Sequence, residues 1–279
     1  MVRPAVRRQA VEHVQQAFGL SERSACRALG FPRASHRYES TRADAPELVA
    51  KLREVAVQRP RFGYRRLHLM LRRAGLNVNH KRIYRLYRLE GLTVRIKRRK
   101  RLAASPRVAP PAPIRSGQRW SMDFVCDHTA EGIRFRVLTL VDDFSRRAPG
   151  LLVERSMSGA RVARFLEELA AVNGRPETIV IDNGPEFVSN ALDQWAHAHN
   201  VRLHFIRPGR PVENAFIESF NGKFRDECLN ANWFHGLDHA REVVAEWVED
   251  YNERRPHSSL GGLTPTEFER AQERTSALG

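Results

Sequence analysis

Residues 178–187 read Thr-Ile-Val-Ile-Asp-Asn-Gly-Pro-Glu-Phe, and this stretch decides the fold. Its first four residues are apolar or β-branched, which predicts a short buried strand over 178–181. Asp182 follows at once, at the carboxyl end of the strand, where α/β sheets open their ligand crevice. Asp-Asn-Gly is also a good turn sequence, so these residues alone favour a turn role and a functional role for Asp182 equally.

Strands and helices alternate on both sides of this stretch. We predict further strands over 120–127, 133–142, 148–153 and 202–205, and helices near 159–172, 188–199 and 213–229. Three strands followed by alternating helices and strands predict an α/β fold with a mixed sheet. Residues 237–253 place their apolar side chains on one stripe, which predicts an amphipathic helix packed on that sheet domain.

The first hundred residues are patterned as helices. Residues 8–38 predict three short helices with the spacing of a helix-turn-helix, and a second helical set is predicted over 46–58, 63–74 and 79–90. In the last of these helices an apolar stripe leaves Lys81, Arg85 and Arg88 on another face. That face could be an ordinary solvated surface, but the basic run 95–101 that follows without an acid favours contact with phosphate.

The charge is divided between the two halves of the chain. Residues 1–119 hold 29 Lys and Arg against seven Asp and Glu, whereas residues 120–279 hold the remaining 18 and 25, so the halves carry +22 and −7. A basic module that binds a polyanion, joined to a module with metal-binding carboxylates, would have this division. We therefore predict four parts: a helix-turn-helix segment 1–42, a basic helix-turn-helix-like domain 43–102, a Pro-rich linker 103–117, and a catalytic core 118–279.

Composition excludes several classes of protein. With 42% hydrophobic residues the chain can bury a core, which excludes a polar disordered tail. Cys26, Cys126 and Cys228 form no CxxC or Cys/His cluster, which argues against a disulfide scaffold and a zinc site. No apolar run is long enough for a membrane span or a signal peptide, so we expect a cytoplasmic protein without a membrane partner.

Three acids lie at positions that the predicted fold would bring together. They are Asp123 in the first strand, Asp182 after the buried strand, and Glu218 on the helix over 213–229. Carboxylates gathered in one place repel one another unless cations neutralise them, which predicts hard divalent ions, Mg²⁺ above all. Two such ions about 3.5–4 Å apart could activate a water or a 3′-hydroxyl and stabilise the leaving oxygen in phosphodiester transfer. We expect Mn²⁺ to substitute.

The strings around these acids resemble those of a known family. Their arrangement is similar to the DDE signature of the retroviral-integrase and transposase superfamily, whose core has a ribonuclease H-like fold. Within that superfamily, the strings are similar to those of the second-frame (OrfB) product of bacterial insertion sequences in the IS-three class. The strings are Asp182-Asn183-Gly184-x-Glu186-Phe187, Asn214-Ala215-x-x-Glu218-Ser219-Phe220 with Arg225 seven residues after Glu218, and Tyr251-Asn252-x-x-Arg255-Pro256-His257-x-x-Leu260-Gly261-x-x-Thr264-Pro265. With the helical region 46–101, the resemblance covers nearly the whole chain.

The resemblance implies a transposase that cleaves DNA at the ends of its element and joins the freed 3′-hydroxyl to another strand. Asp123, Asp182 and Glu218 would be the catalytic and metal-binding residues, and Arg225 would contact the transposon end. The expected DNA-binding residues are Lys81, Arg85, Arg88, Lys97, Arg98, Arg99, Lys100, Arg101 and Arg225. The expected partners are double-stranded DNA (terminal inverted repeats and target), further copies of the chain, and the upstream-frame (OrfA) product, all at the bacterial nucleoid.

Two other functions remain open from the residues. A nuclease of the same fold would hydrolyse DNA without joining it. A DNA-binding regulator with an inert core, derived from such an element, would occupy the ends without metal-dependent turnover.

Overall fold

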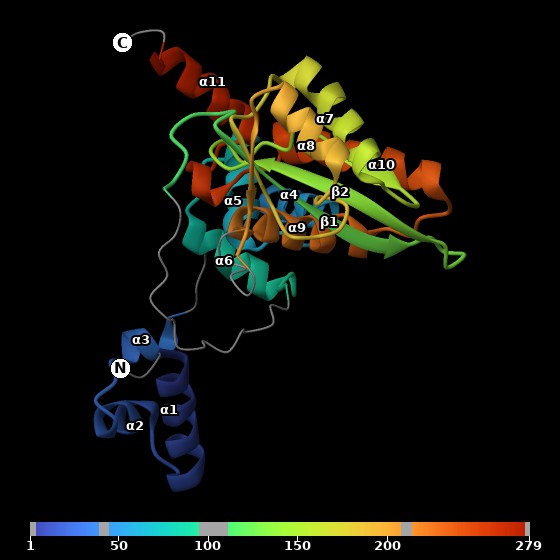
Figure 1. The fold of residues 1–279 in the computed structure, drawn as a ribbon. Coiled ribbons are helices and arrows are strands. Elements are labelled where there is room, and N and C mark those ends of the chain that lie inside the picture. Colours follow the sequence, from blue (N-terminus) through green and yellow to red (C-terminus); the bar gives the residue numbers. More distant parts are fainter. Residues whose placement is uncertain (1–3, 39–44, 95–110, 208–213, 277–279) are drawn as a thin grey trace. The chain divides into compact units, whose positions relative to one another are not determined.

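A computed structural model describes residues 4–38, 45–94, 111–207 and 214–276 of the chain (Figure 1). The chain divides into two compact units, residues 1–51 and 52–279, and each is described by itself. The predicted boundaries of the four parts stay predictions.

The first unit contains the three short helices expected over 8–38. They are α1 (Pro4–Phe18), α2 (Glu22–Ala28) and α3 (Arg33–Arg37), and α1 begins before the predicted start. The side chain of Ser21 caps α2 by accepting a hydrogen bond from the Ser24 N–H. A small apolar core consisting of Val11, Ala25, Cys26 and Phe31 joins the helices.

The second helical set is also confirmed. It comprises α4 (Pro46–Gln58), α5 (Tyr64–Arg73) and α6 (His80–Leu89). The Asn79 side chain caps α6 by accepting from the Lys81 N–H at 2.9 Å. Leu67 and Leu71 of α5 are buried, as are the three apolar residues predicted for the inner stripe of α6, Ile83, Leu86 and Tyr87.

Five strands form the predicted mixed sheet. They are β1 (Arg119–His128), β2 (Arg134–Asp142), β3 (Leu151–Glu154), β4 (Thr178–Ile181) and β5 (Arg202–Phe205), in the order β3-β2-β1-β4-β5. β1, β2 and β3 pair antiparallel, whereas β1, β4 and β5 pair parallel. β3 begins later than the predicted 148, because the backbone of Ala148 instead pairs with the Asn252 side chain through two hydrogen bonds of 2.9 Å.

Helices cover both faces of the sheet (Figure 1). α7 (Gly159–Asn173) and α8 (Asn190–Ala198) pack on one face, and α9 (Ala215–Glu227) and α10 (Leu237–Glu253) pack on the other. Alternation along β1 divides its side chains between the two cores, since Trp120 and Met122 belong to the first core and Val125 to the second. The helix expected over 213–229 is shorter, because Leu229–Ala231 forms a 3-10 turn.

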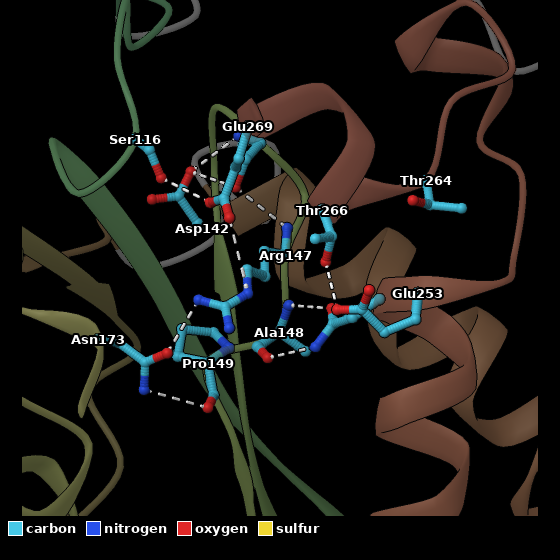
Figure 2. Close-up of polar contacts among 12 residues, drawn as sticks. Ser116, Asp142, Arg147, Ala148, Pro149, Asn173, Glu253, Thr264, Thr266 and Glu269 are labelled. Carbon is cyan, nitrogen blue, oxygen red and sulfur yellow. Dashed lines mark hydrogen bonds and ion pairs between the residues drawn. The ribbon is translucent and has the colours of Figure 1, made fainter. Parts of the chain in front are cut away.

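The sequence analysis did not identify the last helix, α11 (Pro265–Ser276). The Thr264 hydroxyl accepts from the Glu267 N–H at 3.1 Å, and the Glu267 carboxylate accepts from the Thr264 N–H at 2.8 Å, which is a capping box. Figure 2 shows Glu269 of this helix accepting a hydrogen bond from Ser116 and lying beside Arg147. α11 therefore fastens the start of β1 and the β2–β3 turn to the C-terminal segment.

Within the described part of the chain, the helices are too short or too polar to span a lipid bilayer.

Candidate active site

Asp123 lies in the middle of β1 on the face that α9 covers. The register pairs it with Thr139 of β2, and the Thr139 hydroxyl donates to the Asp123 carbonyl oxygen at 3.0 Å. One carboxylate oxygen, Oδ1, accepts a hydrogen bond from the Phe124 N–H at 2.7 Å. The strand thus fixes both the backbone and the side chain of Asp123.

Asp182 directly follows β4, the parallel neighbour of β1. The register pairs Ser121 with Val180. Asp123 and Asp182 each lie two residues further along their parallel strands, so they are at the same level of the sheet. Asp182 Oδ1 accepts a hydrogen bond from the Gly184 N–H at 2.9 Å. A Cβ atom at Gly184 would lie 2.9 Å from that oxygen, so the absence of a side chain there lets the loop close around the carboxylate.

α9 brings the third acid to the same face. Its Asn221 side chain donates to Asp123 Oδ2 at 2.8 Å, and Asn221 Oδ1 lies 2.8 Å from the Thr139 hydroxyl, whose single hydrogen is shared between this oxygen and the Asp123 carbonyl. Glu218 lies three residues before Asn221, on the same side of the helix, and is exposed. The side of α9 that carries Glu218 and Asn221 therefore faces β1.

Arg225 continues this face toward the end of β1. Its guanidinium donates to the Cys126 carbonyl oxygen at 3.0 Å, and the residue is exposed. The described contacts thus place Arg225 on the same line as Glu218 and Asn221, and its role in binding DNA stays a prediction.

The electrostatics reflect the crowding of acids. The pKa of Asp123 is raised to about 6, chiefly by burial and also by the negative charges of Asp182 and Glu218, whereas hydrogen bonds from Phe124 and Asn221 lower it. The negative charges of Asp182 and Glu218 thus act on the pKa of Asp123 in the same direction as its burial. A cation placed among them would relieve this repulsion.

The carboxylates are gathered but not closed into a ligand shell. In residues 4–38, 45–94, 111–207 and 214–276, no set of three or more His, Cys, Asp or Glu side chains stands in a geometry ready to hold a metal ion. Two of the carboxylate oxygens instead accept hydrogen bonds from the neighbouring backbone. The donor set consists of oxygens only, which fits a hard cation such as Mg²⁺ better than zinc.

Sequence reasoning missed an ion pair that anchors the loop carrying Asp182. Arg136 of β2 pairs with Glu186, and its guanidinium lies 4.1 Å from the centre of the Phe124 ring. Phe124 stacks on the buried Phe187, with 4.8 Å between ring centres. Alternation along β2 would place Arg136 on the Phe124 side, but no pattern in the sequence predicts its pairing with a loop 50 residues away.

The predicted DNA-binding residues fall into two groups. Lys81, Arg85 and Arg88 are exposed on α6, opposite its buried stripe, together with Tyr84. Lys97, Arg98, Arg99, Lys100 and Arg101 lie outside the described residues. The exposed basic face of α6 agrees with the predicted geometry, and its contact with DNA stays a prediction.

Family models match three segments of the chain. Residues 113–211 and 199–265 match two models described as "Integrase core domain", and residues 43–100 match a model described as "HTH-like domain". The two core matches together span all three acids. The third covers α4, α5 and α6.

Similar proteins come from bacterial insertion elements. The "Insertion element IS407 uncharacterized 31.7 kDa protein" of Burkholderia multivorans is 48% identical over 256 residues, covering 91% of this chain and 92% of that protein. "Transposase InsF for insertion sequence IS3A" of Escherichia coli K12 is 28% identical over 246 residues, covering 86% and 79%. The chain belongs to the integrase-core transposases of bacterial insertion sequences.

This family membership agrees with the fold. The transposase resembles a chain in the cryoEM structure of a simian T-cell lymphotropic virus intasome in complex with a PP2A regulatory subunit, with a TM-score of 0.52 and 17% identity over 79% of this chain and 74% of that chain. The likeness shows the fold alone. The ribonuclease H-like architecture expected from the sequence is thereby confirmed for the sheet domain of the transposase.

Proposed function

We propose that this transposase cleaves a phosphodiester bond at each end of its insertion sequence and then joins the freed 3′-hydroxyl to a target strand, with Asp123, Asp182 and Glu218 as its catalytic and metal-binding residues. The observation that supports this most is that Asp123 and Asp182 lie at the same level on two paired strands. Asn221 of α9 donates a hydrogen bond to Asp123. The three carboxylates would come from three separate elements, namely β1, the end of β4 and α9.

We infer that the cofactor is Mg²⁺, with two ions at the site and Mn²⁺ able to replace them. When bound, the metal would lower the pKa of the attacking hydroxyl and stabilise the negative charge on the leaving oxygen. The three carboxylates would be its ligands from the protein. The all-oxygen donor set and the raised pKa of Asp123 support a divalent cation, because a buried acid surrounded by acids gains most from a positive partner.

The residues around the carboxylates would hold them in place. Asn221 and Thr139 orient Asp123, and the Gly184 N–H orients Asp182, so that each carboxylate turns little during the reaction. Arg225 would neutralise a phosphate of the element end beside Glu218. These roles follow from hydrogen bonds that leave the remaining lone pairs of each carboxylate oxygen available.

We further infer the partners of the reaction. Double-stranded DNA, both the terminal inverted repeats and the target, would be bound through α6 and the basic run 97–101. The joining of two ends requires at least two active sites near one another, so we expect a homo-oligomer on DNA. The upstream-frame OrfA product is a further expected partner, as a separate chain or a fusion. Because the proposed substrate is bacterial DNA, the place of action would be the bacterial cytoplasm, at the nucleoid.

The experiment compares Asp182→Asn with wild type on labelled DNA that carries an element end. In Mg²⁺ we expect cleavage by Asp182→Asn to fall at least a thousandfold, because one ligand charge is lost, while DNA binding in EDTA stays within twofold of wild type. Asp193→Asn, the same change at an exposed position of α8, serves as the matched control and should cleave normally. Undiminished cleavage by Asp182→Asn would refute the assignment.

The same assay separates the two alternative functions. Cleavage without joined products on target DNA would support a nuclease that only hydrolyses. Binding by the wild-type chain without any metal-dependent turnover would support an inert regulator.

A further inference from the structure

A cleft with a volume of about 920 Å³ lies outside the candidate active site, and we refer to it as the α5–α9 cleft. Three separate segments line it: the start of α5, the residues that follow α6, and the last turn of α9 with the residues after it. Three arginines and one acid are among the lining residues, which makes the cleft a candidate site for an anion. The lining includes Arg61, Tyr64, Arg65, Arg66, Val94 and Asp226.

Two of the three arginines in the cleft are neutralised by acids of α9. Arg61 Nη2 lies 3.3 Å from Asp226 Oδ1, and Arg66 Nη1 donates to Glu227 Oε1 at 2.9 Å. The guanidinium carbon of Arg66 also lies 4.8 Å from the centre of the Phe62 ring. Both side chains therefore have partners within the protein, and they hold the start of α5 against the end of α9.

Arg65 is the third arginine, and no acid in the described part of the chain pairs with it. Its Nε donates a hydrogen bond to the Tyr64 hydroxyl at 3.2 Å, and the residue is exposed to solvent. A guanidinium has five N–H donors, and this bond uses only one of them. The Tyr64 hydroxyl accepts this bond and keeps its own hydrogen. The two side chains therefore retain donors for an anion that enters the cleft from solvent.

The cleft adjoins each of the surfaces predicted to contact DNA. The ring centre of Tyr64 lies 4.7 Å from that of Tyr84, which is 43% exposed on the basic face of α6. Val94, in another wall, is the last residue before the basic run 95–101. Asp226 directly follows the predicted DNA contact on α9. A duplex bound on α6 that continues toward α9 would therefore pass over this cleft.

We propose that the α5–α9 cleft binds a backbone phosphate of double-stranded DNA, held by the Arg65 guanidinium and the Tyr64 hydroxyl. A phosphate accepts strongly from guanidinium donors, and it supplies the negative charge that Arg65 lacks. The inference rests on the proposed DNA substrate, and it adds a contact between the exposed face of α6 and the helix that carries Glu218. Arg61 and Arg66 are not part of this contact, because acids of α9 already neutralise them.

A purely structural role for Arg65 has different consequences. Its guanidinium carbon lies 5.9 Å from the centre of the Tyr64 ring. If Arg65 serves only to cover that ring, its replacement changes stability and leaves the number of counterions released on DNA binding unchanged. A phosphate contact releases counterions, so its loss reduces the magnitude of the slope of log K against log salt by about 0.9. The salt slope therefore separates the two roles.

The experiment measures binding of the full-length chain to a fluorescent 30-base-pair duplex of random sequence, in EDTA, at several salt concentrations. We expect Arg65→Gln to weaken binding about tenfold and to reduce the slope by about 0.9, whereas Arg65→Lys keeps the charge and the wild-type slope. Arg164→Gln is the matched control and should keep the wild-type slope. Arg164 is exposed on α7, which packs on the opposite face of the sheet from α9.

Tyr64→Phe tests the second side chain of the site. It removes the hydroxyl and leaves the charge of Arg65, so we expect binding to weaken about threefold with the wild-type slope. In the Arg65→Gln background the same change should have little further effect, because both side chains hold one phosphate. Additive losses in the double variant would contradict a shared phosphate.

A slope for Arg65→Gln equal to that of wild type overturns the proposal. An equal reduction for Arg164→Gln overturns it too, because the slope would then follow net charge alone. Thermal unfolding checks that each variant is folded, and Arg65→Ala decides in place of Arg65→Gln if the latter does not fold. Because EDTA prevents turnover, this measurement does not depend on the catalytic assignment. Undiminished cleavage by Asp182→Asn would refute the proposed catalytic residues and leave the phosphate site standing.

Discussion

Asp123 combines burial with two acidic neighbours, and this combination has a cost in stability. The pKa of its carboxyl group is raised from 3.8 to about 6, so the folded state binds the proton more tightly than the unfolded state does. The charged form is therefore disfavoured on folding. The resulting loss of stability is complete above pH 6 and disappears as the pH falls toward 4.

We predict that Asp123→Asn stabilises the metal-free protein. A two-unit shift in pKa corresponds to roughly 3 kcal/mol, so we expect the free energy of unfolding at pH 8 in EDTA to increase by about 1–3 kcal/mol. The gain should vanish near pH 4, where the wild-type carboxyl is protonated in both states. Denaturant unfolding at both pH values measures this, and a destabilised variant at pH 8 would contradict the electrostatic account of the site.

Gly184 places Asp182 through close contact. A methyl group at this position would approach Asp182 Oδ1 to 2.9 Å, so the carboxylate would have to turn away from its present direction. We predict that Gly184→Ala reduces cleavage in Mg²⁺ by about tenfold to a hundredfold, while the free energy of unfolding changes by less than about 1 kcal/mol.

Gly222 provides the matched control for this prediction. It lies on α9 with open space around its Cα, so Gly222→Ala should stabilise the helix by up to about 1 kcal/mol and cleave DNA normally. Equal activity of Gly184→Ala and Gly222→Ala would show that the loop does not set the direction of Asp182.

At the level of elements, α11 depends on its first turn. Thr264 is fully buried and exchanges two hydrogen bonds with Glu267, which also pairs with Arg73 of α5 at 2.5 Å. The helix is otherwise polar, and its attachment rests on these contacts and on Phe268, whose ring centre lies 5.4 Å from that of Phe144.

We predict that Thr264→Ala destabilises the transposase by about 1–2 kcal/mol, because the N–H of Glu267 loses its acceptor and the buried hydroxyl leaves a small void. Thr275→Ala, on the exposed last turn of the same helix, is the control and should cost less than about 0.5 kcal/mol. Thermal unfolding distinguishes the two variants, and equal melting temperatures would mean that α11 does not contribute to the global transition.

Local patterns were sufficient to predict most elements of the sheet domain. The apolar run before Asp182 predicted β4, and the alternation of strands and helices predicted the elements that follow it. Thr139 was not predicted as a partner of Asp123, because strand register is set by contacts between distant residues. The capping box at Thr264 could have been recognised, since a Thr followed three residues later by Glu announces a helix start.

At the scale of the whole molecule, the opposite charges of the two halves of the sequence also form ion pairs with one another. Part of the basic half does not remain available for DNA, because Arg59, Arg66 and Arg73 pair with Asp250, Glu227 and Glu267 of the acidic half. These pairs hold α4 and α5 on the helices that surround the sheet. The basic residues predicted to bind DNA on α6 remain exposed, and their contact with DNA stays a prediction. Sequence composition could not distinguish these two uses of arginine.

The central claim is that three acids from β1, the end of β4 and α9 hold divalent metal beside DNA. Crystals of the transposase with element-end DNA and Mn²⁺ test it most directly, through the anomalous scattering of manganese. The account predicts one or two anomalous peaks within ligand distance of carboxylate oxygens from Asp123, Asp182 and Glu218. Manganese bound elsewhere, with these three carboxylates pointing apart, would contradict it.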